Sequence, residues 1–345
     1  MRIHRLLAYD RRTMWHRRKL ANAAAVLALL SSLYAMPQCT PAQGARATGS
    51  QGEKAAPKIS VNSNLVDLPV KVTDGQGRFV SDLNRENFRV YEDGRIQEIT
   101  LFENGDIPAT VGLVVDHSGS MHTKLPEVSA AAVAFARSSN PQDEMFVVNF
   151  NDFVSMELPA NIPFTSDARM LEKAVSSVTA RGRTALNDAI SAALDQLQWA
   201  HRERQALIIV SDGGDNASKH TFAQVLAQAQ RSKAVIYSIG ILDPDDEGEQ
   251  NPRLLKKLVK ATGGEAFFPG SAKEVGSICQ QVARDIRQQY TLGYAPSSAG
   301  ARDVYRKIEV QVIAPGHEKL RVRTRAGYIA PAMSVSPLPT KSGRP

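Results

Sequence analysis

The chain has 345 residues, 43% of them hydrophobic and 22% charged, which is typical of a globular protein with about two domains. The formal net charge is +7, but residues 1–50 hold eight of the 42 bases and one of the 35 acids, so the rest of the chain is neutral. Because the basicity is confined to the N-terminal segment, no nucleic-acid partner is expected. Two cysteines exclude a disulfide framework. Cys279 lies beside an apolar helical stripe, which predicts a buried thiol.

The N-terminal segment, residues 1–40, has the layout of a secretory signal peptide. A basic stretch is followed by an apolar run over residues 20–36 and then by small residues, Pro and Gln. A run of about 17 residues is short for a spanning helix, so an uncleaved signal anchor is the alternative. Cys39 follows Met-Pro-Gln, a poor lipoprotein signal. The protein is therefore expected to be exported to the periplasm, the cell envelope or the outside of the cell, and to contact a membrane only through this segment.

Two β-rich segments flank the middle of the chain. After a linker at residues 41–57, residues 58–106 alternate apolar and polar side chains around the turns Asp-Gly-Gln-Gly and Glu-Asp-Gly. Residues 291–330 alternate in the same way, and the tail at residues 331–345 is expected to be disordered. The two β-rich segments could pack together as a second, small β domain.

Between these segments, residues 109–290 alternate short strands with helices. Strands are predicted at 110–115, 145–150, 206–211, 235–241 and 265–268, with a short edge strand at 153–158. Helices are predicted at 124–138, 167–177, 185–200, 221–232, 252–261 and 272–288. The first four strands are continuous aliphatic runs, which indicates burial on both faces. The pattern predicts an α/β domain with a doubly wound, mostly parallel sheet and helices on both faces.

Side-chain oxygens follow the predicted strands. Asp116, Ser118 and Ser120 come at the end of the first strand, in Asp-His-Ser-Gly-Ser. Asp212 ends a later strand, and Thr184 opens a helix after Arg-Gly-Arg. In a doubly wound sheet, ligands bind outside the carboxyl ends of the strands. These five side chains, from three loops, are therefore expected to converge.

A hard divalent cation suits this set of side chains. Mg²⁺ prefers octahedral oxygen ligands and keeps several waters, and the same ligands suit Mn²⁺. Two carboxylates with neutral hydroxyls would leave the cation electrophilic enough to accept a carboxylate from another molecule. The alternative is local: the same residue types also serve as helix caps and turns.

The three loops, Asp-His-Ser-Gly-Ser-Met, Arg-Gly-Arg-Thr-Ala-Leu and Val-Ser-Asp-Gly-Gly-Asp, resemble those of the metal-ion-dependent adhesion site in von Willebrand factor type A domains. All five ligand types of that family have a match, in order, at Asp116, Ser118, Ser120, Thr184 and Asp212. The resemblance implies that the hydroxyls coordinate directly or nearly so, and the aspartates directly or through water. It covers about residues 109–290. The flanking β segments are similar to those of a bacterial family of exported, von Willebrand factor A-related proteins with a poorly defined function.

Motifs of the common enzyme classes are missing from the sequence. It has no Walker P-loop, no Gly-x-Ser-x-Gly elbow and no His-Glu-x-x-His zinc motif. Ser118 stands where a phosphatase of the haloacid dehalogenase type needs a second Asp. His117 and His122 lack a third zinc ligand nearby and are expected to be exposed loop residues. The acidic run at residues 243–251 lacks the order of an EF-hand.

The sequence therefore predicts an exported, non-enzymatic protein-binding module, for adhesion or scaffolding, that captures an Asp or Glu of a partner protein through Mg²⁺ or Mn²⁺. Segments 121–125, 154–158 and 218–222 are expected to form the rim around the metal. Two alternatives stay open. One is a metal-assisted hydrolase with Asp212 or Asp215 as base, and the other is an envelope scaffold whose metal site is vestigial.

Overall fold

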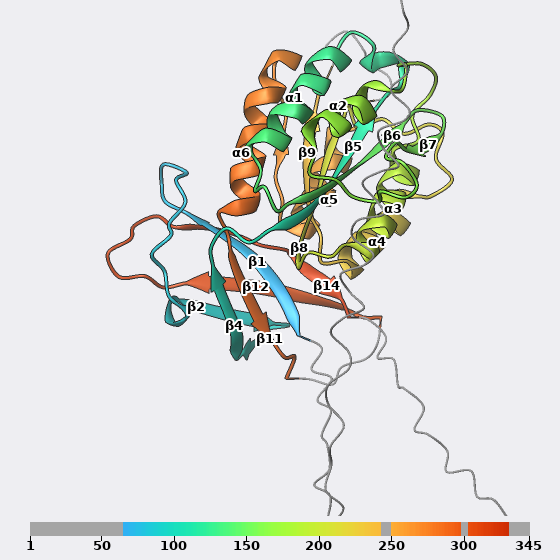
Figure 1. The fold of residues 1–345 in the computed structure, drawn as a ribbon. Coiled ribbons are helices and arrows are strands. Elements are labelled where there is room, and N and C mark those ends of the chain that lie inside the picture. Colours follow the sequence, from blue (N-terminus) through green and yellow to red (C-terminus); the bar gives the residue numbers. More distant parts are fainter. Residues whose placement is uncertain (1–64, 243–249, 298–302, 331–345) are drawn as a thin grey trace, which may run out of the picture. The chain divides into compact units, whose positions relative to one another are not determined.

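The structure is a computed structural model that describes residues 65–242, 250–297 and 303–330. The predicted signal peptide, linker and tail lie outside the described residues, as does most of the acidic run at 243–251. Within the described ranges, no helix is long and apolar enough to cross a membrane. The described residues form an α/β domain and two further sheets of antiparallel strands (Figure 1).

The α/β domain is built on a six-stranded sheet with the order β10-β9-β8-β5-β6-β7. The strands are β5 (Ala109–Asp116), β6 (Glu144–Phe150), β7 (Val154–Met156), β8 (Arg204–Ser211), β9 (Val235–Gly240) and β10 (Ala266–Phe267). Neighbouring strands are parallel except for β6 and β7, so the antiparallel strand lies at one edge. The predicted fold class, a doubly wound and mostly parallel sheet, is confirmed.

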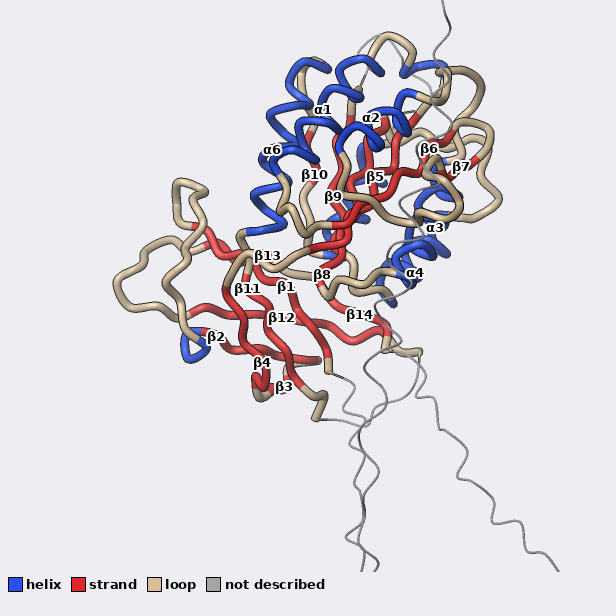
Figure 2. The backbone as a smooth tube through the Cα atoms, viewed as in Figure 1, coloured by secondary structure: helices blue, strands red, loops and turns tan. Residues whose placement is uncertain are grey.

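Helices cover both faces of this sheet (Figure 2). They are α1 (Leu125–Ser138), α2 (Ala168–Ser176), α3 (Leu186–Gln196), α4 (Phe222–Arg231), α5 (Pro252–Thr262) and α6 (Val275–Arg287). One core lies beneath α1, α2 and α6, and the other lies beneath α3, α4 and α5. Because helices pack on both faces, all eight residues of β5 are buried, as expected for a central parallel strand.

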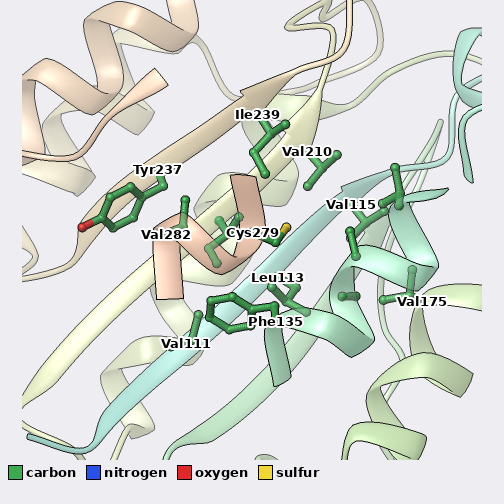
Figure 3. Close-up of a cluster of buried hydrophobic side chains, with 14 of the residues drawn as sticks. Val111, Leu113, Val115, Phe135, Val175, Val210, Tyr237, Ile239, Cys279 and Val282 are labelled. Carbon is green, nitrogen blue, oxygen red and sulfur yellow. The ribbon is translucent and has the colours of Figure 1, made fainter. Parts of the chain in front are cut away.

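Side chains of β5 alternate between the two cores, since successive residues of a strand point to opposite faces. Figure 3 shows the first core, where Val111 and Leu113 of β5 lie among side chains that include Phe135 of α1 and Val282 of α6. Cys279 of α6 belongs to the same core. The prediction of a buried cysteine is confirmed, and burial raises the pKa of its thiol to about 12.

The two β-rich segments combine into two four-stranded antiparallel sheets. One sheet has the order β13-β1-β11-β4 and contains β1 (Val66–Thr73), β4 (Ile99–Asn104), β11 (Tyr290–Tyr294) and β13 (Arg321–Arg323). The other has the order β14-β12-β2-β3 and contains β2 (Phe88–Glu92), β3 (Arg95–Gln97), β12 (Tyr305–Val312) and β14 (Gly327–Ile329). In each sheet, strands from before and after the α/β domain lie side by side.

Both sheets contribute to one apolar core, so they form a β-sandwich. Leu68 of β1 and Leu292 of β11 come from one sheet, and Phe88 of β2 and Ile308 of β12 come from the other. The sandwich continues directly from the α/β domain, because α6 ends at Arg287 and β11 begins at Tyr290.

Candidate metal centre

The first of three polar loops begins where β5 ends, at Asp116. This side chain is fully buried. Its Oδ1 accepts a hydrogen bond of 2.8 Å from the backbone N–H of Ser118, and its Oδ2 accepts one of 2.6 Å from the Ser211 hydroxyl. One carboxylate oxygen thus shapes the local turn, and the other reaches the end of the neighbouring strand β8.

A chain of oxygen atoms runs from this loop to the loop after β8. The Ser118 and Ser120 hydroxyl oxygens are 3.2 Å apart, and the Ser120 hydroxyl donates a hydrogen bond of 2.9 Å to Asp212 Oδ2. The other oxygen of Asp212 accepts a bond of 3.0 Å from the backbone N–H of Gly214. Four of the five predicted ligands, Asp116, Ser118, Ser120 and Asp212, therefore form one continuous series of contacts.

The fifth predicted ligand, Thr184, lies in the loop before α3. Its backbone N–H donates to the Asn216 side chain at 2.8 Å, and its carbonyl oxygen accepts from the backbone N–H groups of Asn216 and Ala217 at 3.0 and 3.1 Å. The residue is buried. No other described residue forms a hydrogen bond with its hydroxyl, so this oxygen is available to a ligand.

Backbone hydrogen bonds join the Thr184 loop to the first loop as well. The Gly119 N–H donates to the Gly182 carbonyl oxygen at 3.2 Å, and the Arg181 N–H donates to the His117 carbonyl oxygen at 2.9 Å. Gly182 has a φ of +78°, and a Cβ atom there would lie 1.8 Å from an oxygen of Asp152. The positive φ favours glycine at this crossing of loops, and any side chain there would also displace the Asp152 carboxylate.

None of the five residues serves as a side-chain cap of a described α-helix. Helix α1 follows Lys124, α3 follows Ala185 and α4 follows Thr221. Only the turn interpretation is partly right, because one oxygen of Asp116 and one of Asp212 accept from a backbone N–H two residues ahead. Asp116 Oδ2, the Ser120 hydroxyl and Asp212 Oδ2 connect the ends of β5 and β8, which a purely local role does not require.

The electrostatics of the site favour a positive ligand. Burial raises the pKa of Asp116 to about 6, and the nearby charge of Asp212 acts in the same direction. Hydrogen bonds from Ser118 and Ser211 oppose this shift. A carboxylate that is costly to ionise in isolation is stabilised when a cation binds beside it.

The side chains present fit a hard divalent cation. They offer two carboxylates and three hydroxyls, which are the oxygen donors that Mg²⁺ and Mn²⁺ accept. Across the part of the chain that the structure describes, no group of three His, Cys, Asp or Glu side chains is placed to hold a metal. The site would thus depend on hydroxyls and water to complete its coordination.

The expectation that His117 is an exposed loop residue is wrong. The side chain is fully buried, and neither ring nitrogen has a hydrogen-bond partner among the described residues. Burial lowers the pKa of the ring. The physical reason is that the backbone of His117 still follows the sheet, donating to the Phe150 carbonyl oxygen at 2.7 Å. His122 is exposed, as expected.

The predicted rim also needs correction. Met121 of the segment 121–125 is fully buried, so it cannot contact a partner. In the loop before β7, Phe153 is 80% exposed, although the expected segment began one residue later. This loop adjoins the Thr184 loop, because the Arg183 N–H donates to Asp152 Oδ2 at 3.1 Å and the Ala185 N–H donates to the Asn151 carbonyl oxygen at 2.8 Å.

Sequence reasoning missed two supporting residues. Ser211 holds Asp116, and Asn216 holds the backbone of Thr184. Asp215, considered as a catalytic base, instead accepts from the Asn187 N–H at 2.7 Å and the Ser218 hydroxyl at 2.7 Å. Each of these residues lies within four positions of Asp212, but only the spatial arrangement shows which group it contacts.

Comparison with known proteins identifies the α/β domain. Residues 111–281 match the family model of the von Willebrand factor type A domain. These residues are a von Willebrand factor type A domain. The match to this domain runs from β5 to α6, and the sandwich lies outside it. No curated protein matches the chain.

The solved structures that resemble this chain share little sequence identity with it. A von Willebrand factor type A protein from Catenulispora acidiphila is 12% identical over 79% of this chain and 76% of its own, with a TM-score of 0.48. An aerotolerance-related membrane protein from Bacteroides fragilis is 14% identical over 51% of this chain and 98% of its own, with a TM-score of 0.42. The von Willebrand factor domain of a type V pili tip protein from Porphyromonas gingivalis is 13% identical over 52% of this chain and 95% of its own, with a TM-score of 0.44.

Proposed function

We propose that this protein is a binding module that captures an Asp or Glu of a partner protein through a divalent cation, Mg²⁺ or Mn²⁺. The observation that supports the proposal is that hydrogen bonds join, pairwise, the three loops that carry Asp116, Ser118, Ser120, Thr184 and Asp212. Two of these loops follow the carboxyl ends of the adjacent parallel strands β5 and β8, which is where ligands bind in such sheets.

The bound cation would supply a positive, electrophilic point at which a partner's carboxylate docks. The residues of this chain would hold it with two carboxylates and three hydroxyls, which leaves the cation electrophilic toward the incoming group. The surrounding surface would set specificity. Exposed Phe153 and Met156 offer apolar contact on one side, and exposed Lys219 and His220 offer polar and positively charged groups near the third loop.

A hydrolase receives less support from the same geometry. Metal-assisted hydrolysis needs a base that can take a proton from water. Asp215 is occupied by the N–H of Asn187 and the hydroxyl of Ser218, and both oxygens of Asp212 accept hydrogen bonds. Because these carboxylates already accept hydrogen bonds, the geometry supports a structural or cation-binding role more than proton transfer.

Export is part of the proposal and rests on the sequence of residues 1–40, which is typical of a secretory signal peptide. The protein would then work in the periplasm, in the cell envelope or outside the cell.

Calorimetric titration of Mg²⁺ and Mn²⁺ into the purified protein tests the proposal. We expect binding that Asp116→Ala abolishes and that Asp195→Ala, an exposed carboxylate on α3, leaves intact. Partner capture should then require the metal and be lost on chelation. If the native protein binds neither ion at millimolar concentration, or if Asp116→Ala binds as well as the native protein, the proposal is wrong.

A further inference from the structure

A second candidate site lies where the von Willebrand factor type A domain meets the sandwich. It is a cleft of about 1400 Å³ lined by residues of α6, β1 and β13 and by the loops beside them. None of the five predicted metal ligands is among its lining residues. The cleft is therefore separate from the candidate metal centre.

Positive charge dominates the lining of this cleft. Six bases and three acids line it. The bases are Lys71, Arg78, Arg284, Arg287, Arg321 and Arg323, and the acids are Asp106, Glu265 and Asp285. Since the chain beyond residue 50 is neutral as a whole, this excess is a local concentration of charge.

Each of the three acids already contacts a base. Asp106 accepts from Arg287 Nε at 2.7 Å. Asp285 contacts both Lys71 and Arg323, the latter at 2.6 Å, and Glu265 pairs with Arg323. Within the described residues, Arg284 of α6 and Arg321 of β13 have no ion pair or side-chain hydrogen bond. Both arginines are exposed to solvent and line the cleft.

Lys71 is a largely buried cation at the wall of this cleft, paired with Asp285. Its pKa is lowered to about 8, mainly by burial and then by the charge of Arg323, and Arg284 acts in the same direction. The charges of Arg323 and Arg284 thus add to the effect of burial, while the charge of Glu265 opposes it. An anionic ligand would relieve this repulsion.

We propose that this cleft binds an acidic segment of a polypeptide. An unpaired arginine can bind a carboxylate through two parallel hydrogen bonds. Arg284 of the α/β domain and Arg321 of the sandwich can each bind a carboxylate in this way. The exposed amides of Gln281 and Gln288 suit a peptide backbone, and Phe79 supplies an apolar wall. The ligand would contact both domains at once.

The lining favours a polypeptide over a nucleic acid. A nucleic acid carries a charge at every phosphate, whereas only two arginines of the cleft, Arg284 and Arg321, are without an ion pair among the described residues. Single-stranded nucleic acids also stack on aromatic side chains, and Phe79 is the one aromatic residue among the lining residues. A peptide can place its carboxylates opposite the arginines alone.

Fluorescence anisotropy with a labelled oligoglutamate peptide and the full-length protein tests this site. We expect binding that weakens as salt is added, because the contacts are between exposed charges. The double variant Arg284→Glu, Arg321→Glu should bind roughly tenfold more weakly or worse. The control is Arg95→Glu, Arg169→Glu, which makes the same change of charge at exposed residues outside the cleft, one in each domain.

Further measurements show whether binding depends on the metal centre, and whether the cleft prefers a peptide to other polyanions. Binding should persist in Asp116→Ala and in the presence of a chelator. The proposal is overturned if the two double variants weaken binding equally, or if chelation abolishes it. It is also overturned if single-stranded DNA or polyphosphate binds and the peptide does not. Melting temperatures close to that of the native protein would show that both variants are folded.

Discussion

The Ser120 hydroxyl donates a hydrogen bond of 2.9 Å to Oδ2 of Asp212, although the two residues are 92 positions apart in the chain. They meet because β5 and β8 are adjacent and parallel, so both strands end at the same edge of the sheet. The von Willebrand factor type A fold collects the oxygens of the candidate site in this way, and the site can be altered without removing the sheet.

Asp116→Asn separates metal binding from stability. Asparagine can still accept the hydrogen bond from the Ser118 N–H, and it removes a buried charge. We expect affinity for Mg²⁺ to fall at least about tenfold, while the melting temperature in chelator at pH 7 does not fall. Calorimetry and thermal denaturation give the two readouts. A large loss of stability without metal would mean that Asp116 is mainly a structural residue.

Stability without metal should depend on pH through Asp116. Its pKa in the folded protein is raised to about 6, above the usual 3.8, so its contribution to stability is complete below pH 4 and is lost as the pH rises through about 6. The loss is on the order of 1–3 kcal/mol. In chelator, the native protein should lose stability relative to Asp116→Asn between pH 4 and 7.

Added Mg²⁺ should reverse that trend, because the cation and the proton compete for the same carboxylate. Its stabilising effect is expected to grow from pH 5 to pH 7, as measured by urea denaturation with and without the ion. A stabilisation that is independent of pH would argue against a direct role of Asp116 in metal binding.

Gly182→Ala should disturb the loop that carries Thr184. The new Cβ would lie 1.8 Å from Asp152 Oδ2, and the φ of +78° is unfavourable for alanine. We expect a loss of about 1–3 kcal/mol of stability and weaker metal binding. Adding Asp152→Ala should recover part of the loss, since it removes the clash but not the backbone strain. No recovery would contradict this contact.

Glu92→Ala should destabilise the sandwich. The carboxylate is buried and accepts from Arg306 at 2.7 Å, Tyr294 at 2.6 Å and Tyr328 at 2.8 Å. Its removal leaves a buried guanidinium without its partner, at a cost of about 3–5 kcal/mol. Urea denaturation measures the change, and Glu309→Ala, at an exposed position of β12, serves as the control. Equal stability of the two variants would refute the role of this network.

Local patterns predicted much of the α/β domain and the identity of the candidate ligands. Continuous aliphatic runs such as β5 indicated buried parallel strands, because a strand covered on both faces needs apolar side chains at every position. The residue types and their order in three loops were enough to propose Asp116, Ser118, Ser120, Thr184 and Asp212. Whether they hold a metal stays a prediction.

The tertiary structure decided the contacts between distant segments. An alternating pattern shows which face of a strand is buried but does not show which strand lies beside it, so the sequence could suggest that the two β-rich segments pack together without fixing the pairing of β1 with β11. The same holds for Ser211 against Asp116, for the burial of His117, and for the unpaired Arg284 and Arg321 in one cleft. Each depends on where separate elements pack, and packing is a property of the whole chain rather than of any short stretch.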